Sequence, residues 1–267
     1  MLFALFSFCT GEVRANGVET VQEKGELVVA LHKEDWPPFF CANKDGELWG
    51  LDIDMARNIA SNLGVRIRFT RDAKTFDEIV EEVESGRADI AVSYLSDTLE
   101  RGKHVRFTQP YLSLYQAMLV NRLEKVRARR GINIDDVINY EGVRIGVLSG
   151  SAAVSYAHDY YPKAEVVRYD SNDALIRDAR KGQIFAVMSD EVDIRNMLGV
   201  YPDAAIDIEV VVLRNRPDTL AIAVSMDNPD LQCWLDLYLR KIRQNGFLDH
   251  LIHLYIETNI CRTDSNR

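Results

Sequence analysis

The strongest constraint on the fold of this 267-residue chain is an alternation of strands and helices that occurs twice. The first unit comprises apolar strand segments at 26–31, 65–69 and 89–93 and helical segments at 52–63 and 76–83. Apolar residues recur at helical spacing within 52–63, and Gly64 predicts the end of that helix. Because strands and helices alternate, this unit favours a parallel sheet with helices on both faces.

A second unit of the same order follows a polar, basic connector at 122–131. It comprises strand segments at 144–147, 165–169 and 185–188 and helical segments at 152–160 and 172–181. Two units of similar order predict an α/β fold with two doubly wound lobes rather than one continuous sheet.

The segments around the second unit indicate how the lobes are joined. We expect extended crossover strands at 112–120 and 215–221, one on each side of the second unit. Two further helices are predicted at 229–244 and 247–256, and they return most simply to the first lobe. The expected domains are lobe 1 at 25–111 plus 222–258, lobe 2 at 121–214, and the two crossovers as hinges between them.

The N-terminal residues have the features of a secretory signal. Residues 1–9 form an apolar run much shorter than the roughly 20 residues that span a bilayer, and Val13-Arg14-Ala15 offers a cleavage site. The basic residues that usually precede such a run are missing, so a buried N-terminal strand remains the alternative. On the first interpretation residues 1–15 are a signal peptide, the mature chain begins near Asn16, and the protein is periplasmic or otherwise extracytoplasmic.

The charge balance excludes nucleic acid as an expected partner. The chain has 41 acidic and 32 basic side chains, for a formal net charge of -9. Such a chain repels phosphate backbones and anionic membrane surfaces. The net charge does not constrain a small ligand, because a single arginine can still line a cleft of an acidic protein.

Several other kinds of site are absent from the sequence. The four cysteines have no metal-like spacing, and Cys233 and Cys261 either form a disulfide or remain thiols. His250 and His253 share a helix face but have no third ligand nearby. The chain contains neither the phosphate-binding motif of nucleotide-binding proteins nor a nucleophile elbow, so we expect no metal, no cofactor and no covalent catalysis.

The loop after the strand segment 89–93 carries groups that suit a carboxylate ligand. In a doubly wound sheet, ligands bind at the carboxyl ends of the strands, and two facing lobes bring both sets of strand ends into one cleft. Ser96 and Thr98 supply hydroxyls. Arg101, a short distance further along the chain, supplies a planar guanidinium group that can bind both oxygens of a carboxylate. The sequence therefore predicts that this loop binds a small anionic group.

Five segments of the chain then resemble a known family in order and spacing. They are G-E-L-V-V-A-L followed by W-P-P-F, G-x-D-I-D-M-A-x-x-I-A, S-G-R-A-D-I-A, T-L-E-R and F-T-Q-P-Y. Together they look like the periplasmic amino-acid-binding proteins of ABC importers, the family-3 solute-binding proteins, and the resemblance runs from about Gly25 to about Ile256. It implies the type II periplasmic-binding-protein fold, with a ligand cleft between the lobes.

The resemblance also implies which residues bind the ligand. Arg101 and Ser96 correspond to the positions that bind the ligand carboxylate, while the main chain at Tyr94 and the side chain of Asp190 correspond to those that bind its ammonium group. The other implied ligand-binding residues are Trp36 and Phe76 around the ligand side chain, Thr98 in the loop, and Ser149, Ser151 and Ala152 in a turn before a helix N-terminus.

The chain departs from the family pattern at three positions. Tyr94 stands where glycine is frequent, Leu148 where members with polar ligands often have a basic residue, and Lys33 where some members are acidic. These differences leave the ligand side chain open.

Each assignment also has a structural alternative. Arg101 could be a surface arginine paired with Glu100 or Asp97, and Asp190 could be the N-cap of a helix. Trp36 could pack the adjacent proline loop, Phe76 could belong to the core, and 149–153 could be an ordinary turn.

Three functions are compatible with this interpretation. The leading one is a monomeric solute-binding protein, not an enzyme, that captures an amino acid or similar zwitterion by lobe closure and delivers it to the permease of an ABC transporter. A second is a sensory ligand-binding module. A third is an enzyme like the cyclohexadienyl dehydratases, which act on arogenate or prephenate, and the cluster Asp190, Glu191 and Asp193 keeps that possibility open.

Overall fold

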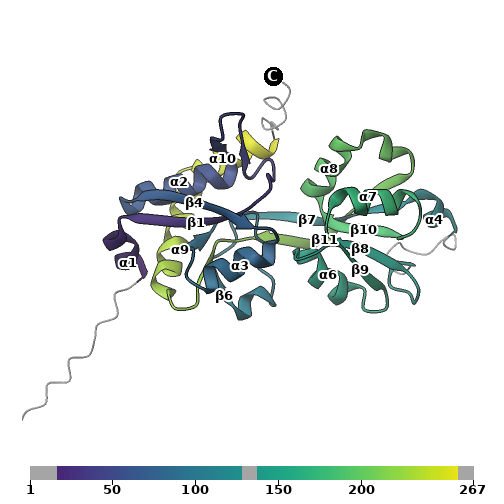
Figure 1. Cartoon of the computed structure of the whole chain (residues 1–267), viewed down its shortest axis with the longest axis horizontal. Coiled ribbons are helices and arrows are strands. Elements are labelled where there is room, and N and C mark those ends of the chain that lie inside the picture. Colours follow the sequence, from purple (N-terminus) through teal and green to yellow (C-terminus); the bar gives the residue numbers. More distant parts are fainter. Residues whose placement is uncertain (1–16, 128–136, 258–267) are drawn as a thin grey trace, which may run out of the picture.

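The computed structural model of the chain describes residues 17–127 and 137–257. The predicted signal peptide 1–15 lies outside these residues. Cys261 lies outside them as well, so the two alternatives for Cys233 and Cys261, a disulfide or thiols, both stay open. Figure 1 shows two lobes side by side, connected at the centre of the molecule by two long strands. The predicted fold class, two doubly wound lobes joined by two crossover strands, is confirmed.

The first lobe is built on a five-stranded sheet with the order β4-β1-β5-β12-β6. Its parallel part pairs β1 with β4 and with β5, while β12 lies antiparallel between β5 and the edge strand β6. The strands are β1 (Glu26–His32), β4 (Arg66–Ala73), β5 (Ile90–Ala91), β6 (Val105–Phe107) and β12 (Ala223–Ser225), and a separate hairpin consists of β2 (Cys41–Ala42) and β3 (Leu48–Trp49). The helices are α1 (Gly17–Lys24), α2 (Leu51–Leu63), α3 (Phe76–Glu84), α9 (Pro229–Gln244) and α10 (Phe247–Ile252), followed by the π-helical turn His253–Glu257, with a 3-10 turn at Arg101–Lys103.

The second lobe is built on a five-stranded sheet with the order β11-β7-β10-β8-β9. Strands β8, β9 and β10 run parallel, while β7 and β11 are antiparallel to their neighbours. The strands are β7 (Leu112–Asn121), β8 (Arg144–Leu148), β9 (Glu165–Tyr169), β10 (Ala186–Asp190) and β11 (Ile208–Leu220). The helices are α4 (Arg122–Arg127), α6 (Ala152–Tyr160), α7 (Asn172–Arg180) and α8 (Glu191–Val200), with a 3-10 turn at Pro202–Ile206.

Hydrophobic burial follows the two faces of the second sheet. Successive side chains of a strand point to opposite faces, so neighbouring residues of β7 and β10 enter different clusters. Met118, Val120, Ala186 and Met188 join the cluster that contains α6, whereas Ala117, Leu119 and Val187 join the cluster that contains α7 and α8. Helices therefore cover both faces, as the alternating pattern predicts. The first lobe has one continuous core, to which α9 and α10 contribute Leu231, Leu235, Leu239, Leu248 and Leu251.

Local sequence signals explain where the helices begin and end. Thr75 caps α3 by accepting a hydrogen bond from the Glu78 amide at 3.1 Å, and Ser171 caps α7 in the same way. Gly64 ends α2 in the left-handed conformation, which its missing side chain permits. The structure places α2, α6 and α9 within one residue, at each end, of the helices predicted at 52–63, 152–160 and 229–244.

The structure differs from the sequence prediction in the second crossover. The expected segment was 215–221, but β11 begins at Ile208 and pairs with β7 along both strands. The basic connector also contains α4, and α1 and β6 were not predicted. The differences in β6 and β11 arise because the length of a strand depends on its partner strand, which sequence periodicity does not reveal. The expected limits of the two lobes remain a prediction.

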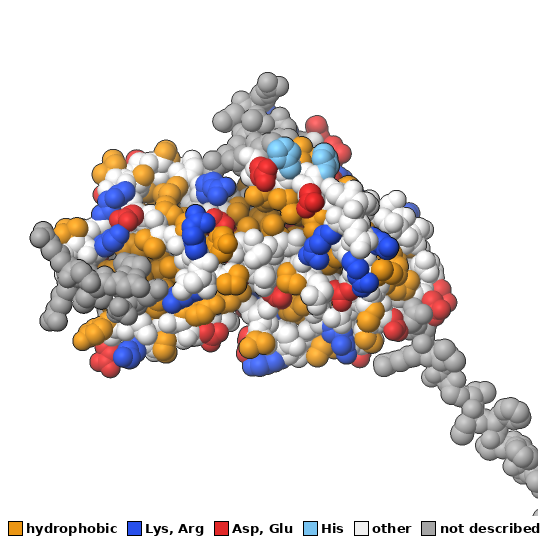
Figure 2. Space-filling view, turned by 180° about the vertical axis from the view of Figure 1, so that it is seen from behind, with side chains coloured by type: hydrophobic (Ala, Val, Ile, Leu, Met, Phe, Trp, Pro, Cys, Tyr) orange, Lys and Arg blue, Asp and Glu red, His pale blue; other side chains and the backbone are white. Residues whose placement is uncertain are grey.

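The surface is mixed in charge. Figure 2 shows Lys and Arg side chains interspersed with Asp and Glu on the face seen from behind, with apolar side chains between them. Within 17–127 and 137–257, no helix combines the length and the apolar character that crossing a bilayer requires.

Candidate functional site

A cavity of about 40 Å³ lies between the two lobes. It is lined by Trp36, Phe76, Tyr94, Ser96, Arg101, Gln116, Leu148, Ser151, Ala152, Ala153, Ser189, Asp190, Asp193 and Asp218. Eight of the ten residues proposed from the sequence are among them. The other two, Thr98 and Ser149, lie elsewhere: Thr98 accepts a hydrogen bond from the Arg101 amide, and Ser149 lines an outer groove.

Arg101 is buried at the contact between the lobes, with 5% of its surface exposed. Its Nε donates to Asp77 Oδ1 at 3.1 Å, and its two terminal nitrogens donate to the carbonyl oxygens of Ser96 at 3.1 Å and Gly150 at 3.2 Å. Gly150 belongs to lobe 2, so the guanidinium group bridges the lobes. The alternative of a surface arginine paired with Glu100 or Asp97 is wrong, because Arg101 is buried and its partner is Asp77.

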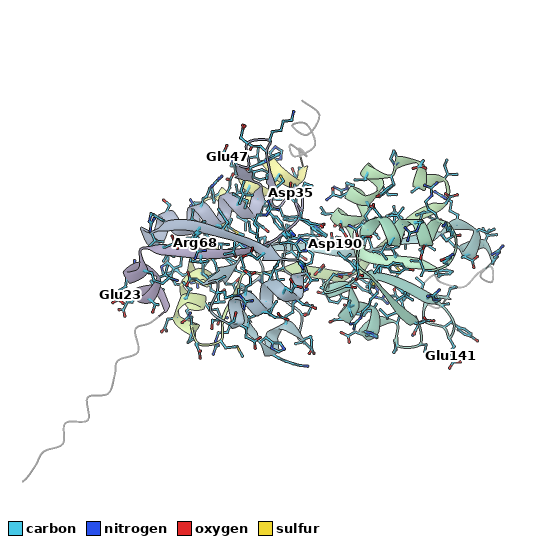
Figure 3. All side chains as sticks on the ribbon, in the orientation of Figure 1. Glu23, Asp35, Glu47, Arg68, Glu141 and Asp190 are labelled. Atoms are coloured by element: carbon cyan, nitrogen blue, oxygen red, sulfur yellow. The ribbon has the colours of Figure 1, made fainter. Side chains whose placement is uncertain are left out.

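Asp190 also lines the cavity, from lobe 2, at the junction of β10 and α8. Figure 3 shows it near the centre of the molecule, between the two lobes. Its Oδ1 accepts hydrogen bonds from the amides of Val192 at 2.8 Å and Asp193 at 3.1 Å, so it is the N-cap of α8. Its Oδ2 accepts from the hydroxyl of Tyr94 in lobe 1. Asp190 therefore caps a helix and also lines the cavity, and its expected contact with a ligand ammonium group stays a prediction.

Tyr94 is held in an unusual backbone conformation. Its φ of 51° makes it the one non-glycine residue with positive φ in the described part of the chain, which is uncommon for a bulky side chain. Its amide donates to Asp52 Oδ2 at 2.6 Å, and Tyr111 donates to the other oxygen of that carboxylate at 2.9 Å. Burial raises the pKa of Asp52 to about 7. Asp52 thus positions the turn that places the Tyr94 hydroxyl opposite Asp190.

Aromatic rings form the apolar wall of the cavity. The ring centroids of Trp36 and Phe76 are 5.0 Å apart, and each lies about as close to the ring of His32. Tyr94 stacks on Phe39 with centroids 4.2 Å apart. Trp36 and Phe76 are buried in the lobe 1 core and also line the cavity, so the cavity role and the packing role coincide in these two residues.

Three carboxylic acids face the cavity, and burial raises the pKa of each. The pKa of Asp193 is raised to about 7 by burial and by the charge of Asp190, and that of Asp218 to about 7 for the same reasons. Burial also raises the pKa of Asp190 itself. The carboxylates accept from neutral donors: Ser189 to Asp193 at 2.7 Å and Tyr156 to Asp218 at 3.0 Å. Within the described residues, no group of three or more His, Cys, Asp or Glu side chains is arranged to hold a metal ion.

A larger groove of about 810 Å³ adjoins the cavity. The two spaces share Trp36, Phe76, Leu148 and Asp193, so a ligand that extends past these residues enters the groove. Six carboxylates and two lysines line the groove: Glu34, Asp35, Glu78, Asp170, Asp173, Asp193, Lys33 and Lys74. The region is therefore predominantly acidic.

The lobes also meet at the rim of the cavity. Gly150, with a φ of +67°, lies against Thr75 so closely that a Cβ atom at this position would be 2.6 Å from the Thr75 Cβ. Its carbonyl accepts from the Asp77 amide at 3.2 Å, and Asn196 of lobe 2 donates to the Pro37 carbonyl of lobe 1 at 2.6 Å. These contacts hold the two lobes together around the cavity.

Sequence reasoning did not assign four of the polar residues described above. Gln116 and Asp218 lie on the crossover strands, Asp52 lies in α2, and Tyr156 lies in α6. Asp193 was named only for the enzymatic alternative. A signal was present for Asp52, which is one of two acids in the G-x-D-I-D-M segment. Nothing in the local sequence marks Gln116 as a cavity residue or Tyr156 as the donor to Asp218.

Comparison with known proteins agrees with this architecture. The profile of the bacterial extracellular solute-binding proteins, family 3, matches residues 27–258. The ABC transporter arginine-binding protein 1 of Escherichia coli K12 is 28% identical over 212 residues, which cover 79% of this chain and 83% of that protein.

Two solved structures illustrate the similarity of fold. The crystal structure of an ancestral amino acid-binding protein, a precursor of cyclohexadienyl dehydratase, has 26% identity and a TM-score of 0.71, covering 90% of this chain and 99% of that one. The substrate-binding protein AbpA of a Streptococcus pneumoniae amino acid ABC transporter, bound to L-arginine, has 28% identity and a TM-score of 0.68, covering 88% and 96%.

Proposed function

Since the chain belongs to the bacterial extracellular solute-binding proteins of family 3, we propose that it binds an amino acid between its lobes and delivers it to the permease of an ABC transporter. The relatives support this ligand class, because the Escherichia coli protein is named for arginine and the Streptococcus pneumoniae protein was solved with L-arginine. The same proposal places the protein outside the cytoplasm. It also has the protein act as a monomer.

One observation carries the proposal: Arg101 of lobe 1 and Asp190 of lobe 2 line the same cavity. A guanidinium group pairs with a carboxylate and a buried carboxylate pairs with an ammonium group, so this arrangement matches the two ends of a zwitterion. The charges come from different lobes, and a ligand that contacts both therefore stabilises the contact between the lobes.

The size of the cavity indicates that binding requires a rearrangement. A cavity of about 40 Å³ is much smaller than the roughly 150 Å³ that accommodates benzene. The Tyr94 hydroxyl occupies the position next to Asp190 that the ligand ammonium group needs. We therefore infer that the lobes separate or the Tyr94 side chain turns away when the ligand enters.

Thermal-shift and calorimetric titration with the twenty common amino acids test the proposal. A ligand at 100 times its Kd should add about 2.7 kcal/mol to the free energy of unfolding. Arg101→Ala and Asp190→Asn should each weaken the binding of that ligand on the order of 30-fold or more, because each removes one member of a desolvated charge pair. Asparagine at position 190 retains the ability to cap α8, so the second variant separates binding from stability.

Arg127→Ala and Glu141→Ala are the matched controls. Arg127 is exposed on α4, and Glu141 lies on the outer side of lobe 2 (Figure 3), so both variants should bind like the parent protein. Affinities of the two cavity variants within threefold of the parent would contradict the two-ended clamp.

Asp193 favours one second candidate, an enzyme of the cyclohexadienyl dehydratase type. A buried carboxyl group with a pKa of about 7 can act as a general acid near neutral pH, and Asp193 lines the cavity. Incubation with prephenate or arogenate decides between the functions. Binding without formation of an aromatic product supports a binding protein, whereas product formation that Asp193→Asn abolishes supports the enzyme.

A further inference from the structure

The cavity contains more negative than positive charge. Asp190, Asp193 and Asp218 line it, and Arg101 is the one basic side chain among its lining residues. Arg101 already donates to Asp77 and to two carbonyl oxygens. A zwitterion that binds Arg101 and Asp190 therefore adds no cation for Asp193, and Asp218 has only the charge of Arg101, whose effect on the Asp218 pKa is smaller than the opposing effects of burial and Asp190.

Gln116 provides an independent sign that the cavity lacks a donor. Its side chain is 1% exposed, and no described group donates to its Oε1. Gln116 lies on β7 directly opposite Asp190 on β10, and opposite residues of an antiparallel pair have their side chains on the same face. A buried amide oxygen without a donor is unfavourable, so a ligand that donates to it binds more tightly.

The hydroxyl groups that donate to these carboxylates are uncharged. Asp193 receives a hydrogen bond from Ser189, Asp218 from Tyr156 and Ser96, and Asp190 from Tyr94. The Tyr94 hydroxyl donates to Asp190, and the charges of Asp190, Asp193 and Asp218 all raise the pKa of Tyr94, after the larger effect of burial. A neutral hydroxyl thus lies where three carboxylates favour a cation.

We propose that Asp193, Asp218 and the amide oxygen of Gln116 form a subsite for a second positive charge, so that the ligand is an amino acid with an amine or guanidinium group in its side chain. This inference rests on the proposed function and specifies its ligand class. Such a group supplies several N–H donors to acceptors that lack them and offsets the negative charge that the zwitterion leaves unpaired. Asp193 also lines the acidic outer groove, so a long side chain stays next to carboxylates as it leaves the cavity.

Pairs of ligands with the same shape and different charge test the subsite. Citrulline replaces the guanidinium group of arginine by a neutral urea, and norleucine replaces the ammonium group of lysine by a methyl group. Calorimetry should show that the charged member of each pair binds at least 30-fold more tightly, the effect expected for one desolvated charge pair. Citrulline within threefold of arginine and norleucine within threefold of lysine would overturn the subsite.

Variants of the subsite give a second readout. Asp193→Asn, Asp218→Asn and Gln116→Leu should each reduce the ratio of arginine to citrulline affinity, because each variant removes an acceptor for the charged group. Glu141→Gln, an acid-to-amide change at an exposed position, should leave the ratio unchanged. A parental ratio in all three cavity variants would overturn the assignment of these residues.

The same titrations separate the inference from the proposed function. If the neutral and charged members bind equally, the amino-acid function stands and the subsite is wrong. If no amino acid binds, both are wrong. Agmatine, which keeps the guanidinium group but lacks the carboxylate, completes the set: affinity equal to that of arginine would support the cation subsite and contradict the role of Arg101.

Discussion

At the level of single residues, Tyr94 connects the backbone of lobe 1 with the acidic wall of lobe 2. The Asp52 carboxylate holds its amide, and its hydroxyl donates to Asp190. A residue in a sparsely populated backbone conformation persists when its surroundings determine it, and here Asp52 and the stacked ring of Phe39 do so. The strained backbone of Tyr94 therefore occurs at the residue whose hydroxyl contacts Asp190 of the other lobe.

Removal of the Tyr94 hydroxyl tests its competition with the ligand. Tyr94→Phe preserves the ring and its stacking but frees Asp190 Oδ2 for an ammonium group. A hydrogen bond to a charged group contributes about 1.5–3 kcal/mol, so we expect affinity for the amino acid to increase about tenfold in calorimetry. A tenfold loss would instead mean that the hydroxyl contacts the bound ligand.

At the level of elements, the turn between β8 and α6 lies against the N-terminus of α3. Gly150 occupies this turn, and its carbonyl accepts hydrogen bonds from both Arg101 and Asp77. The close approach of the two lobes at this point requires both a positive φ and a missing side chain.

Alanine at position 150 should weaken ligand binding. Its Cβ atom would lie 2.6 Å from the Thr75 Cβ, so the lobes could not reach the observed contact. We expect Gly150→Ala to reduce affinity more than tenfold in calorimetry. Gly142→Ala is the matched control, because Gly142 also has a positive φ of +84° but has nothing within 4 Å of an added Cβ atom. Both variants should lose about 1–2 kcal/mol of stability from backbone strain, and only Gly150→Ala should lose affinity. Equal affinities would exclude this contact from the bound state.

At the level of the whole molecule, buried carboxylic acids make stability depend on pH. The pKa values of Asp52, Asp193 and Asp218 are raised to about 7 by burial, with an added contribution from Asp190 for the latter two. Because their pKa values in the unfolded chain lie near 4, the folded protein binds more protons between about pH 4 and pH 7. These groups therefore make the folded protein less stable as pH rises through that window, and their effect levels off above it.

Urea unfolding at pH 5, 6 and 7 measures this dependence. Each group should lower the free energy of unfolding by up to about 1.4 kcal/mol per pH unit. Asp193→Asn should reduce the slope by the contribution of one group, and Glu141→Gln should leave it unchanged. An identical slope in the parent and Asp193→Asn proteins would contradict the raised pKa of Asp193.

The local sequence was sufficient to predict most of the fold. The helical period within 52–63, the Asn228-Pro229 start and the Gly246 break are local signals, and the corresponding helices lie where they were predicted. The order of the units predicted two doubly wound lobes, and the T-L-E-R segment identified Arg101 as a cavity residue because its position relative to the strand end is also local.

Apart from Asp190, which the family resemblance had assigned, the tertiary structure alone decided the acidic side of the cavity. Gln116, Asp190 and Asp218 are far apart in sequence, and they meet because β7 pairs with both β10 and β11. Strand pairing places Gln116 opposite Asp190, and burial then removes the water that would otherwise solvate their polar groups. Register and burial are properties of the assembled sheet. Local sequence therefore determined which residues form strands, whereas the folded chain determined which further carboxylates line the same cavity as Asp190.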